Sequence, residues 1–285
     1  MEIRDRVAVV TGGASGIGRS LSIALAGHGA AVVVSDVDAD GAAMVAAEIA
    51  GRGQQALAVI ADVASEPDIQ ALINQAEQAF GRIDLVCSNA GIIVAGGVEV
   101  PDEAWSRIWA INVQSHIYLA RAVLPGMLAR GEGYLVITAS AAGLLTQLGS
   151  APYAVTKHAA VALAEWLSIS YGDRGIGVSC LCPQAVTTNL GATSLREVAA
   201  FVPAPADTGA IPAAAGSGSV SLQASVDGVL TPDQVAASVL AGVADERFLI
   251  LPHPQVATYE RRRAEDRDRW LGGMRRLHGR LAGRS

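Results

Sequence analysis

Near its start the chain runs Val7-Ala8-Val9-Val10-Thr11-Gly12-Gly13-Ala14-Ser15-Gly16-Ile17-Gly18, a short apolar strand followed by a glycine-rich turn. Glycines in such a turn permit a tight bend, close approach of a diphosphate to backbone N–H groups, and close packing of the following helix. A glycine-rich turn alone can also be a plain strand-to-helix connection, but its place between a strand and a helix favours a dinucleotide. No Gly-Lys-Ser/Thr sequence ends the turn, which argues against a loop that cleaves nucleoside triphosphates.

Outward from this turn, apolar runs alternate with alanine-rich helical segments. The runs are predicted strands at Val7–Thr11, Ala31–Asp36, Ala56–Ala61, Asp84–Asn89, Tyr134–Thr138, Gly177–Cys182 and Arg247–Leu251. The segments between them are predicted helices at Gly16–Ala26, Asp40–Ala50, Glu66–Phe80, Asp102–Arg130 and Ala151–Tyr171. Runs that are apolar on both faces are typical of parallel strands covered by helices on either side. The pattern predicts an α/β fold built on one doubly wound, seven-stranded parallel sheet.

One connection is unusually long. Residues 190–230 are rich in Ala, Gly, Ser and Pro, and ordinary connections have about 4–6 residues. The segment is either disordered or a lid over a site. Its place after the sixth predicted strand favours a lid, because binding residues gather on loops at strand ends.

The end of the chain is basic. We expect a first domain of residues 1–255 and a helical extension of residues 256–285, which from Glu260 onward carries nine Arg and four acidic residues. Apolar residues recur in the extension at helical spacing, at Trp270, Met274, Leu277 and Leu281. A basic amphipathic helix can lie on a membrane surface or on nucleic acid. We favour instead packing of the apolar stripe on the body or on a neighbouring subunit.

The composition argues against several classes of function. Of the 285 residues, 51% are hydrophobic and only 4% are aromatic, which disfavours a base-stacking surface for nucleic acid. The net charge of −6 gives the whole chain no attraction to polyanions. We expect no signal peptide and no membrane span. Three cysteines and five histidines without metal-type spacing predict free thiols, no metal site and a cytoplasmic protein.

Carboxylates and small residues end the second, third and fourth predicted strands. Asp36 lies 18 residues after Gly18, where a carboxylate can accept bonds from a ribose 2′-hydroxyl and repel a 2′-phosphate. This favours NAD over NADP, although an aspartate there can also merely cap the next turn. Asp62-Val63 is placed to hold an adenine, and Ser88-Asn89-Ala90-Gly91 lets a cofactor lie against the sheet edge.

The chain has a single lysine, Lys157, four residues after Tyr153. Residues four apart share one face of a helix, so the ammonium can lie beside the phenol. A cation there favours the phenolate and makes the tyrosine a usable proton shuttle. Taken alone, this spacing favours one stray lysine on a surface helix.

These motifs together resemble the short-chain dehydrogenase/reductase family. The resemblance spans roughly residues 5–190 and is carried by Thr11–Gly18, Asp62-Val63, Ser88–Gly91, Asn112, Ser140 and Tyr153 with Lys157. It implies a single Rossmann domain, a nicotinamide cofactor, hydride transfer and commonly a homotetramer. It implies cofactor contacts at Gly12, Ser15, Gly16, Ile17, Gly18, Asp36, Asp62, Val63, Asn89, Ala90, Gly91, Tyr153, Lys157, Pro183, Val186 and Thr188.

The chemistry expected of these residues is the movement of a hydride and a proton. Tyr153 is the expected general acid/base, and Lys157 together with a positive nicotinamide is expected to lower its pKa. Ser140 is expected to steady the substrate oxygen as charge develops. By resemblance, Asn112 holds a water that joins Lys157 to solvent; without the resemblance it could be an exposed polar helix residue.

The chain departs from the family pattern at two positions. Ser88 stands where the family has the first Asn of Asn-Asn-Ala-Gly, at a mainly structural position. Gln184 follows Pro183 where the family usually has Gly, so we expect its side chain to reach the nicotinamide mouth.

The expected substrate pocket is mainly apolar. Its predicted substrate contacts are Ser140, Tyr153, Ile93, Ala142 and Gln147, with the 190–230 segment above them. An apolar, uncharged pocket favours NAD-linked interconversion of a hydrophobic secondary alcohol and its ketone. A hydroxysteroid or cyclic (dihydro)diol dehydrogenase of a degradation pathway would need the same residues. A nicotinamide-sensing binding protein is the alternative from outside the enzymes.

Overall fold

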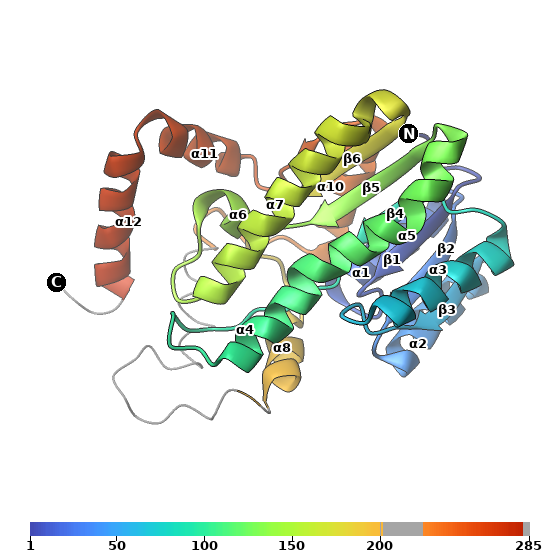
Figure 1. The fold of residues 1–285 in the computed structure, drawn as a ribbon, viewed down its shortest axis with the longest axis horizontal. Coiled ribbons are helices and arrows are strands. Elements are labelled where there is room, and N and C mark those ends of the chain that lie inside the picture. The colour runs from blue at the N-terminus through green and yellow to red at the C-terminus, as the bar shows by residue number, and fades with distance from the viewer. Residues whose placement is uncertain (200, 202–224, 282–285) are drawn as a thin grey trace.

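Seven parallel strands form one sheet at the centre of the molecule. The computed structural model describes residues 1–199, 201 and 225–281. The strands are β1 (Val7–Thr11), β2 (Ala31–Asp36), β3 (Ala56–Ile60), β4 (Leu85–Ser88), β5 (Gly133–Thr138), β6 (Ile176–Leu181) and β7 (Leu249–Ile250). They pair in the order β3-β2-β1-β4-β5-β6-β7, and every pair is parallel (Figure 1). The predicted sheet is confirmed, although β7 is shorter than the predicted run Arg247–Leu251.

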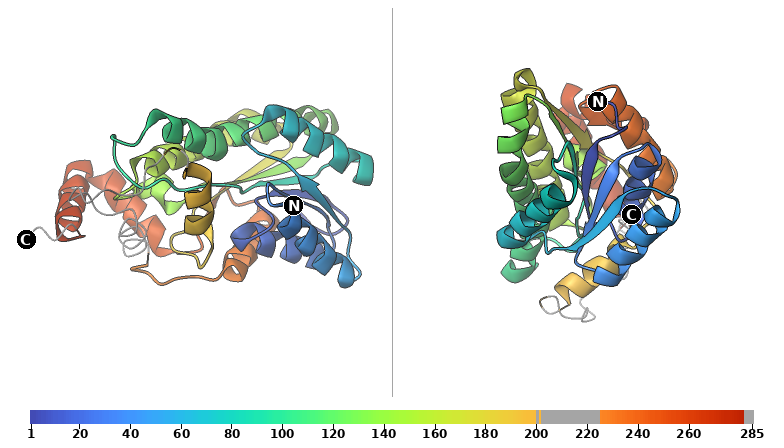
Figure 2. Two further views of the ribbon diagram at one scale, coloured as in Figure 1. Left: turned by 90° about the horizontal axis from the view of Figure 1, so that it is seen from below. Right: turned by 90° about the vertical axis from the view of Figure 1, so that its right-hand side faces the viewer.

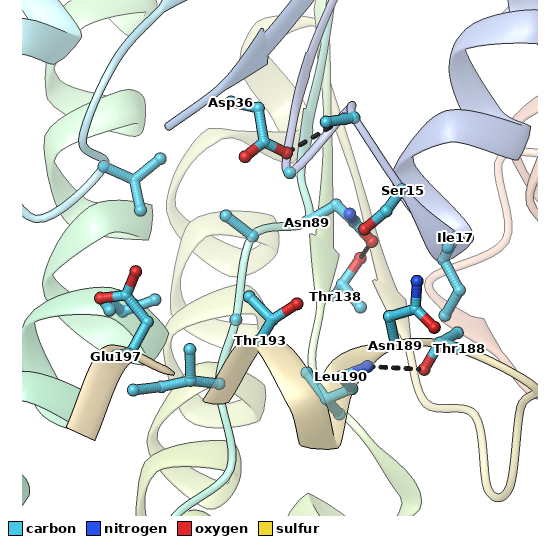
Figure 3. A pocket seen from close by; sticks show the side chains of 18 of the residues that line it. Ser15, Ile17, Asp36, Asn89, Thr138, Thr188, Asn189, Leu190, Thr193 and Glu197 are labelled. Atoms are coloured by element: carbon cyan, nitrogen blue, oxygen red, sulfur yellow. Dashed lines mark hydrogen bonds between the residues drawn. The ribbon is translucent and has the colours of Figure 1, made fainter. Parts of the chain in front are cut away.

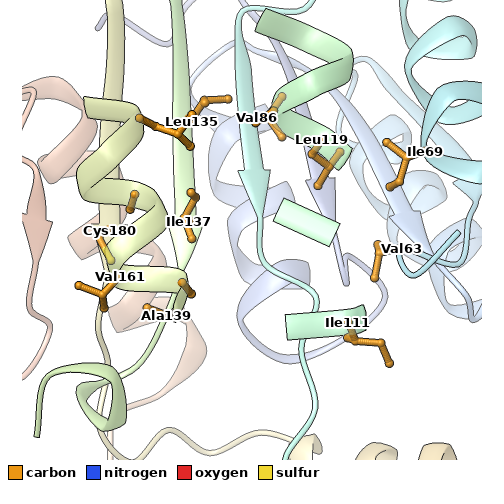
Figure 4. Close-up of a cluster of buried hydrophobic side chains, with 14 of the residues drawn as sticks. Val63, Ile69, Val86, Ile111, Leu119, Leu135, Ile137, Ala139, Val161 and Cys180 are labelled. Atoms are coloured by element: carbon orange, nitrogen blue, oxygen red, sulfur yellow. The ribbon is translucent and has the colours of Figure 1, made fainter. Parts of the chain in front are cut away.

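Helices cover both faces of the sheet because alternate strand residues point to opposite sides. Val9, Val33 and Val86 belong to one buried core, part of which is drawn in Figure 4. That face is covered by α3 (Glu66–Phe80), α5 (Ser115–Arg130) and α7 (Ala151–Tyr171). Val10 and Val34 belong to the core of the other face, which α1 (Gly16–Gly27), α2 (Ala39–Gly51) and α10 (Pro232–Ala244) cover (Figure 2).

The helix predicted over Asp102–Arg130 is not continuous. It consists of α4 (Asp102–Trp109), a π-helical turn η1 (Ala110–Gln114) and α5. A π-helical turn inside a helix is rare and is frequently found at functional sites. Here it contains Asn112, whose side chain is fully buried.

Two short helices follow β5 and β6, and a 3₁₀ turn lies before β6. The short helix α6 (Ala141–Leu145) follows β5, α8 (Leu190–Val198) follows β6, and a 3₁₀ turn η2 (Gly172–Arg174) precedes β6. Neither α6 nor α8 was expected from the sequence. Much of the expected lid, residues 202–224, lies outside the described residues.

The basic extension forms two helices, α11 (Gln255–Glu265) and α12 (Arg267–Leu281). Asp266 between them has extended backbone, with φ of −148°. Val256 of α11 is fully buried, whereas α12 has no buried residue and projects from the body (Figures 1 and 2). Within the described ranges, no helix has the length and apolar character needed to cross a membrane.

Candidate active site

One cavity at the carboxyl ends of the strands brings most of the predicted site residues together (Figure 3). The predicted residues that line it are Gly12, Ser15, Gly16, Ile17, Asp36, Asp62, Val63, Asn89, Ala90, Gly91, Ser140, Tyr153, Lys157, Pro183, Val186 and Thr188. This follows from the topology, because parallel strands end at one edge of the sheet and ligands bind there.

The glycine-rich turn brings the backbone of β1 and α1 close together. Gly12 and Gly16 have positive φ of +66° and +51°, a conformation that other residues adopt at a cost. A β-carbon added at Gly18 would overlap the carbonyl oxygen of Gly12. Gly18 therefore shapes the turn from behind and does not line the cavity.

The amino end of α1 is open to a ligand. Ser15 occupies the N-cap position in an extended conformation, and its side chain makes no capping hydrogen bond. Ser15, Gly16 and Ile17 all line the cavity. Free N–H groups and the positive end of the helix dipole suit a diphosphate, so the turn fits the dinucleotide that the sequence predicts.

Asp36 is held in place at the end of β2. Its carboxylate accepts hydrogen bonds from the N–H groups of Ala14 and Asp38, both at 3.0 Å. Asp38, not Asp36, caps α2 by accepting the Gly41 N–H. A positioned carboxylate at the cavity wall fits the pair of ribose hydroxyls of NAD.

An ion-pair clasp that the sequence did not indicate crosses the cavity. Arg107 of α4 donates to the carboxylate of Asp62 at 3.1 Å and to that of Glu197 in α8 at 2.7 Å. The Asp62 carboxylate, expected to face an adenine, is thus partly engaged by Arg107. All three residues line the cavity.

A second contact ties α8 to the body. The Ser194 hydroxyl accepts the Ile93 N–H at 2.9 Å. Together with the clasp, this contact holds α8 over the site from its middle and from its carboxyl half.

Asn89 joins three strands below the cavity. Its side chain donates to the Thr11 carbonyl at 3.1 Å and accepts from the Thr138 hydroxyl at 3.2 Å. The Thr11 hydroxyl accepts the Asn89 and Ala90 N–H groups. These bonds fix the ends of β1, β4 and β5, so Asn89 shapes the cavity floor.

Tyr153 and Lys157 lie in α7 and face the cavity together with Ser140. The Lys157 ammonium donates to the Thr138 carbonyl at 2.8 Å and lies 5.7 Å from the centre of the Tyr153 ring. Lys157 is only 3% exposed, so it is not a stray surface lysine. The Ser140 hydroxyl accepts the Ala142 N–H at 3.1 Å, which fixes it at the start of α6.

In the protein alone, burial governs the pKa values of Tyr153 and Lys157. Burial raises the pKa of Tyr153, and its hydrogen bond with Ser140 lowers it by less. Burial also lowers the pKa of Lys157 to about 8, so the ammonium is itself destabilised. In the protein alone, desolvation therefore outweighs the Ser140 hydrogen bond. The lowering of the tyrosine pKa by Lys157 together with a positive nicotinamide stays a prediction.

Asn112 is buried behind the site rather than exposed. Its amide oxygen accepts the Ile92 N–H, and its amide nitrogen donates to the Ile92 carbonyl, both at 2.8 Å. The nitrogen also donates to the Thr156 hydroxyl at 3.2 Å. The π-helical turn thus positions Asn112 to hold the segment after β4 beside Lys157, but Asn112 does not line the cavity.

Both departures from the family pattern have a structural partner. The hydroxyl of Ser88 lies 2.5 Å from Nδ1 of His116, which is buried one helical turn after Asn112. Burial and the nearby Lys157 lower the pKa of His116 to about 3, so the imidazole is neutral. Gln184 lines the cavity as expected, and its N–H donates to Nδ1 of the buried His253 at 3.2 Å.

The predicted substrate contacts are only partly brought to the cavity. Ser140 and Tyr153 line it, whereas Ile93, Ala142 and Gln147 do not. Ala142 is buried in α6 with its N–H bonded to Ser140, and Ile93 is bonded through its backbone to α8. Within the part of the chain that is described, no group of three or more His, Cys, Asp or Glu residues is placed to hold a metal ion.

The family model described as short chain dehydrogenase matches residues 6–198. The chain belongs to the short-chain dehydrogenase/reductase family. The 1-deoxy-11-beta-hydroxypentalenate dehydrogenase of Streptomyces exfoliatus is 42% identical over 192 residues, 66% of this chain and 70% of that protein. The 3beta-hydroxysteroid dehydrogenase 2 of Eggerthella lenta is 33% identical over 192 residues, 66% of this chain and 74% of its own length.

A solved member of the family extends the likeness beyond the matched region. The short chain dehydrogenase/reductase of Burkholderia phymatum, in complex with NAD, has a TM-score of 0.86 and 31% identity to this chain. The match covers 94% of this chain and 96% of that one. This short-chain dehydrogenase/reductase is therefore an oxidoreductase that acts on hydroxyl groups with a nicotinamide dinucleotide.

Proposed function

We propose that this enzyme interconverts a hydrophobic secondary alcohol and its ketone with NAD, using Tyr153 as general acid/base. The observation that carries the proposal is that Tyr153, Ser140 and Lys157 line the same cavity as the glycine-rich turn and Asp36. Proton-transfer groups and a dinucleotide cradle thus share one space. A protein that only senses nicotinamide needs no Tyr153, Ser140 and Lys157 for proton transfer, which argues against the non-enzyme alternative.

The site residues have separate roles in the oxidation of the alcohol. Bound nicotinamide would supply the carbon that accepts the hydride. Tyr153 takes the hydroxyl proton, while Ser140 donates to the same substrate oxygen and steadies the charge on it. Lys157, fixed by the Thr138 carbonyl, keeps further N–H donors for the ribose hydroxyls. Asn112 positions the backbone beside Lys157 and completes a proton relay through water.

The cofactor preference rests on Asp36. Its carboxylate would accept from the ribose 2′-hydroxyl of NAD and repel the 2′-phosphate of NADP. The adjacent cavity residues Val37 and Asp38 supply no positive charge to offset this repulsion.

The substrate class is supported by the relatives. One relative is named for a hydroxypentalenate and another for a 3beta-hydroxysteroid. These names favour the alternative of a hydroxysteroid or cyclic (dihydro)diol dehydrogenase over a small open-chain alcohol. In either case the reacting group is a secondary hydroxyl.

Two wider expectations remain proposals. A homotetramer is supported by exposed apolar side chains on α7, where Val155, Trp166 and Ile169 are 48%, 57% and 83% exposed. A cytoplasmic location is supported by three buried free thiols at Cys87, Cys180 and Cys182.

The proposed function is tested by an absorbance screen of secondary alcohols with NAD and with NADP. We expect turnover of at least one steroid or cyclic alcohol, faster with NAD than with NADP. Asp36→Ala should lose this preference, while Asp40→Ala, at an exposed acidic residue of α2, should keep it. Faster turnover with NADP in the unmodified enzyme would overturn the cofactor assignment.

A further inference from the structure

The carboxyl-terminal helices form an arm that is anchored at one end only. We use "the arm" for α11 and α12, residues 255–281. Val256 is fully buried, and the Tyr259 hydroxyl donates to Asp227 at 2.9 Å. Arg263 lies 3.3 Å from the ring nitrogen Nε2 of His158, the neighbour of Lys157 in α7. These contacts fix α11 on the body near the active site.

The second half of the arm exposes apolar side chains to solvent. No residue of α12 is buried. Trp270, Met274 and Leu277 form a half-buried stripe on one face, and Trp270 packs partly against the chain's own core. Leu271 beside the stripe is 48% exposed. A partly exposed apolar stripe on a projecting helix is typical of an interaction surface.

The charge of residues 260–285 indicates what covers this stripe. Residues 260–285 have nine Arg and four acidic residues, a net charge of +5. Since the whole chain carries −6, residues 1–259 carry −11. Two arms would repel each other, and the body would repel nucleic acid, whereas the arm and the body of a second copy attract.

An acidic and apolar segment of the body matches the arm. We use "the acidic rim" for residues 97–103, in which Val98 is 90% exposed and Glu99, Asp102 and Glu103 are all exposed. The rim is next to Gly96, which bridges to Ser150 at the start of α7. The acidic rim therefore lies beside the amino-terminal end of α7, the helix that carries Tyr153.

We propose that α12 of one copy docks on the acidic rim of a second copy of this chain. The apolar stripe covers Val98, and Arg267, on the same side of the helix as Trp270 and Met274, pairs with Glu103. Successive helix residues are about 100° apart, which places Arg267 about 50° and Arg275 about 130° from the centre of the stripe. Arg275 thus faces away from the docked surface.

Sedimentation equilibrium of the full chain and its variants tests this interface. Deleting residues 267–285 should remove one association step. Trp270→Ser should raise the dissociation constant of that step about 30-fold. Arg267→Glu should raise it about 3- to 10-fold. The matched Arg275→Glu should leave it unchanged.

A charge exchange decides whether the rim is the receptor. Glu103→Arg combined with Arg267→Glu should restore the association that either substitution alone weakens. Unchanged association after the deletion would overturn the proposal, and so would failure of the double variant to recover. Duplex DNA and anionic vesicles serve as further probes. Binding of either through α12, with association unaffected by the deletion, would also refute docking between copies.

Discussion

Lys157 shows how a single buried side chain connects the sheet to the chemistry. Its ammonium is held by the Thr138 carbonyl at the end of β5 and lies beside the Tyr153 ring. Burial lowers the pKa of Lys157 and raises that of Tyr153. Both groups are thus pushed toward their neutral forms in the protein alone. A positive nicotinamide in the cavity would supply the field that favours the phenolate.

Removing the phenol hydroxyl should separate chemistry from binding. In Tyr153→Phe, kcat should fall about 10²- to 10⁴-fold because the ring lacks the hydroxyl group that takes the substrate proton. The dissociation constant for NADH, measured by fluorescence, should change less than about 3-fold, since the aromatic ring still fills its place. Tyr171→Phe, outside the cavity, is the control. Equal losses of binding and turnover would contradict the assigned role.

The buried His116 should make the fold sensitive to acid. Its pKa in the folded state, about 3, is below its ordinary value of 6.5. The unfolded chain therefore binds the proton first, and stability is lost as the pH falls below 6.5. When the pH is lowered from 6.5 to 4.5, the unfolding free energy of the unmodified protein should fall. In His116→Asn this fall should be smaller by about 1–3 kcal/mol.

Urea titrations at each pH measure this difference in acid sensitivity. His278→Asn, at an exposed residue of α12, should retain the acid sensitivity of the unmodified protein. Parallel pH profiles for the unmodified protein and His116→Asn would contradict a neutral buried imidazole.

A site residue could be predicted from the sequence where its residue type and its place after a predicted strand are enough to suggest its role. The glycine-rich turn, Asp36, Ser140, Tyr153 and Lys157 reach one cavity as expected. The Ser88–His116 pair was not foreseen, because it joins β4 to a helix and depends on packing. Ile93, Ala142 and Gln147 were predicted as substrate contacts from their position in the sequence. In the structure they make other contacts.

At the scale of elements, α8 is the part of the site that depends most on single contacts. It is held by the Arg107–Glu197 ion pair and by Ser194 against the backbone of Ile93. It also contributes Leu190 and Thr193 to the cavity wall (Figure 3). Cofactor binding should therefore depend on how well α8 is held.

Weakening the clasp should loosen cofactor binding. Glu197→Gln leaves Arg107 without one of its two carboxylates, so the dissociation rate of NADH should rise about 3- to 10-fold. Stopped-flow displacement of NADH measures this rate. Glu165→Gln, at an exposed residue of α7, is the matched control. An unchanged rate in Glu197→Gln would show that α8 is not retained by this ion pair.

The order and type of the strands and long helices were predictable, because the spacing of apolar residues and the glycine-rich turns can be read from short stretches of sequence. The break in Asp102–Arg130 was not, since the π-helical turn is stabilised by Asn112 bonds to Ile92, 20 residues earlier. The break at Asp266 was also missed. Apolar spacing continues on both sides of it, from Tyr259 to Trp270.

At the scale of the whole molecule, the site exists only because the strand order brings distant segments together. β1 and β4 are neighbours in the sheet although more than seventy residues separate them. Their ends carry the glycine-rich turn and Asn89, and β5 beside them carries Ser140 and the anchor of Lys157. The fold thus provides both a cradle and a proton-transfer group at one edge.

Isotope transfer tests this account most directly. The best alcohol of the screen, deuterated at its hydroxyl-bearing carbon, is incubated with NAD and the enzyme, and the reduced cofactor is analysed by mass spectrometry. We predict that one deuterium moves to the nicotinamide ring with each ketone formed, and that Tyr153→Phe slows the transfer about 10²- to 10⁴-fold while still binding NAD. Ketone formation without deuterium in the cofactor, or undiminished transfer by Tyr153→Phe, would contradict the proposed hydride transfer with Tyr153 as general acid/base.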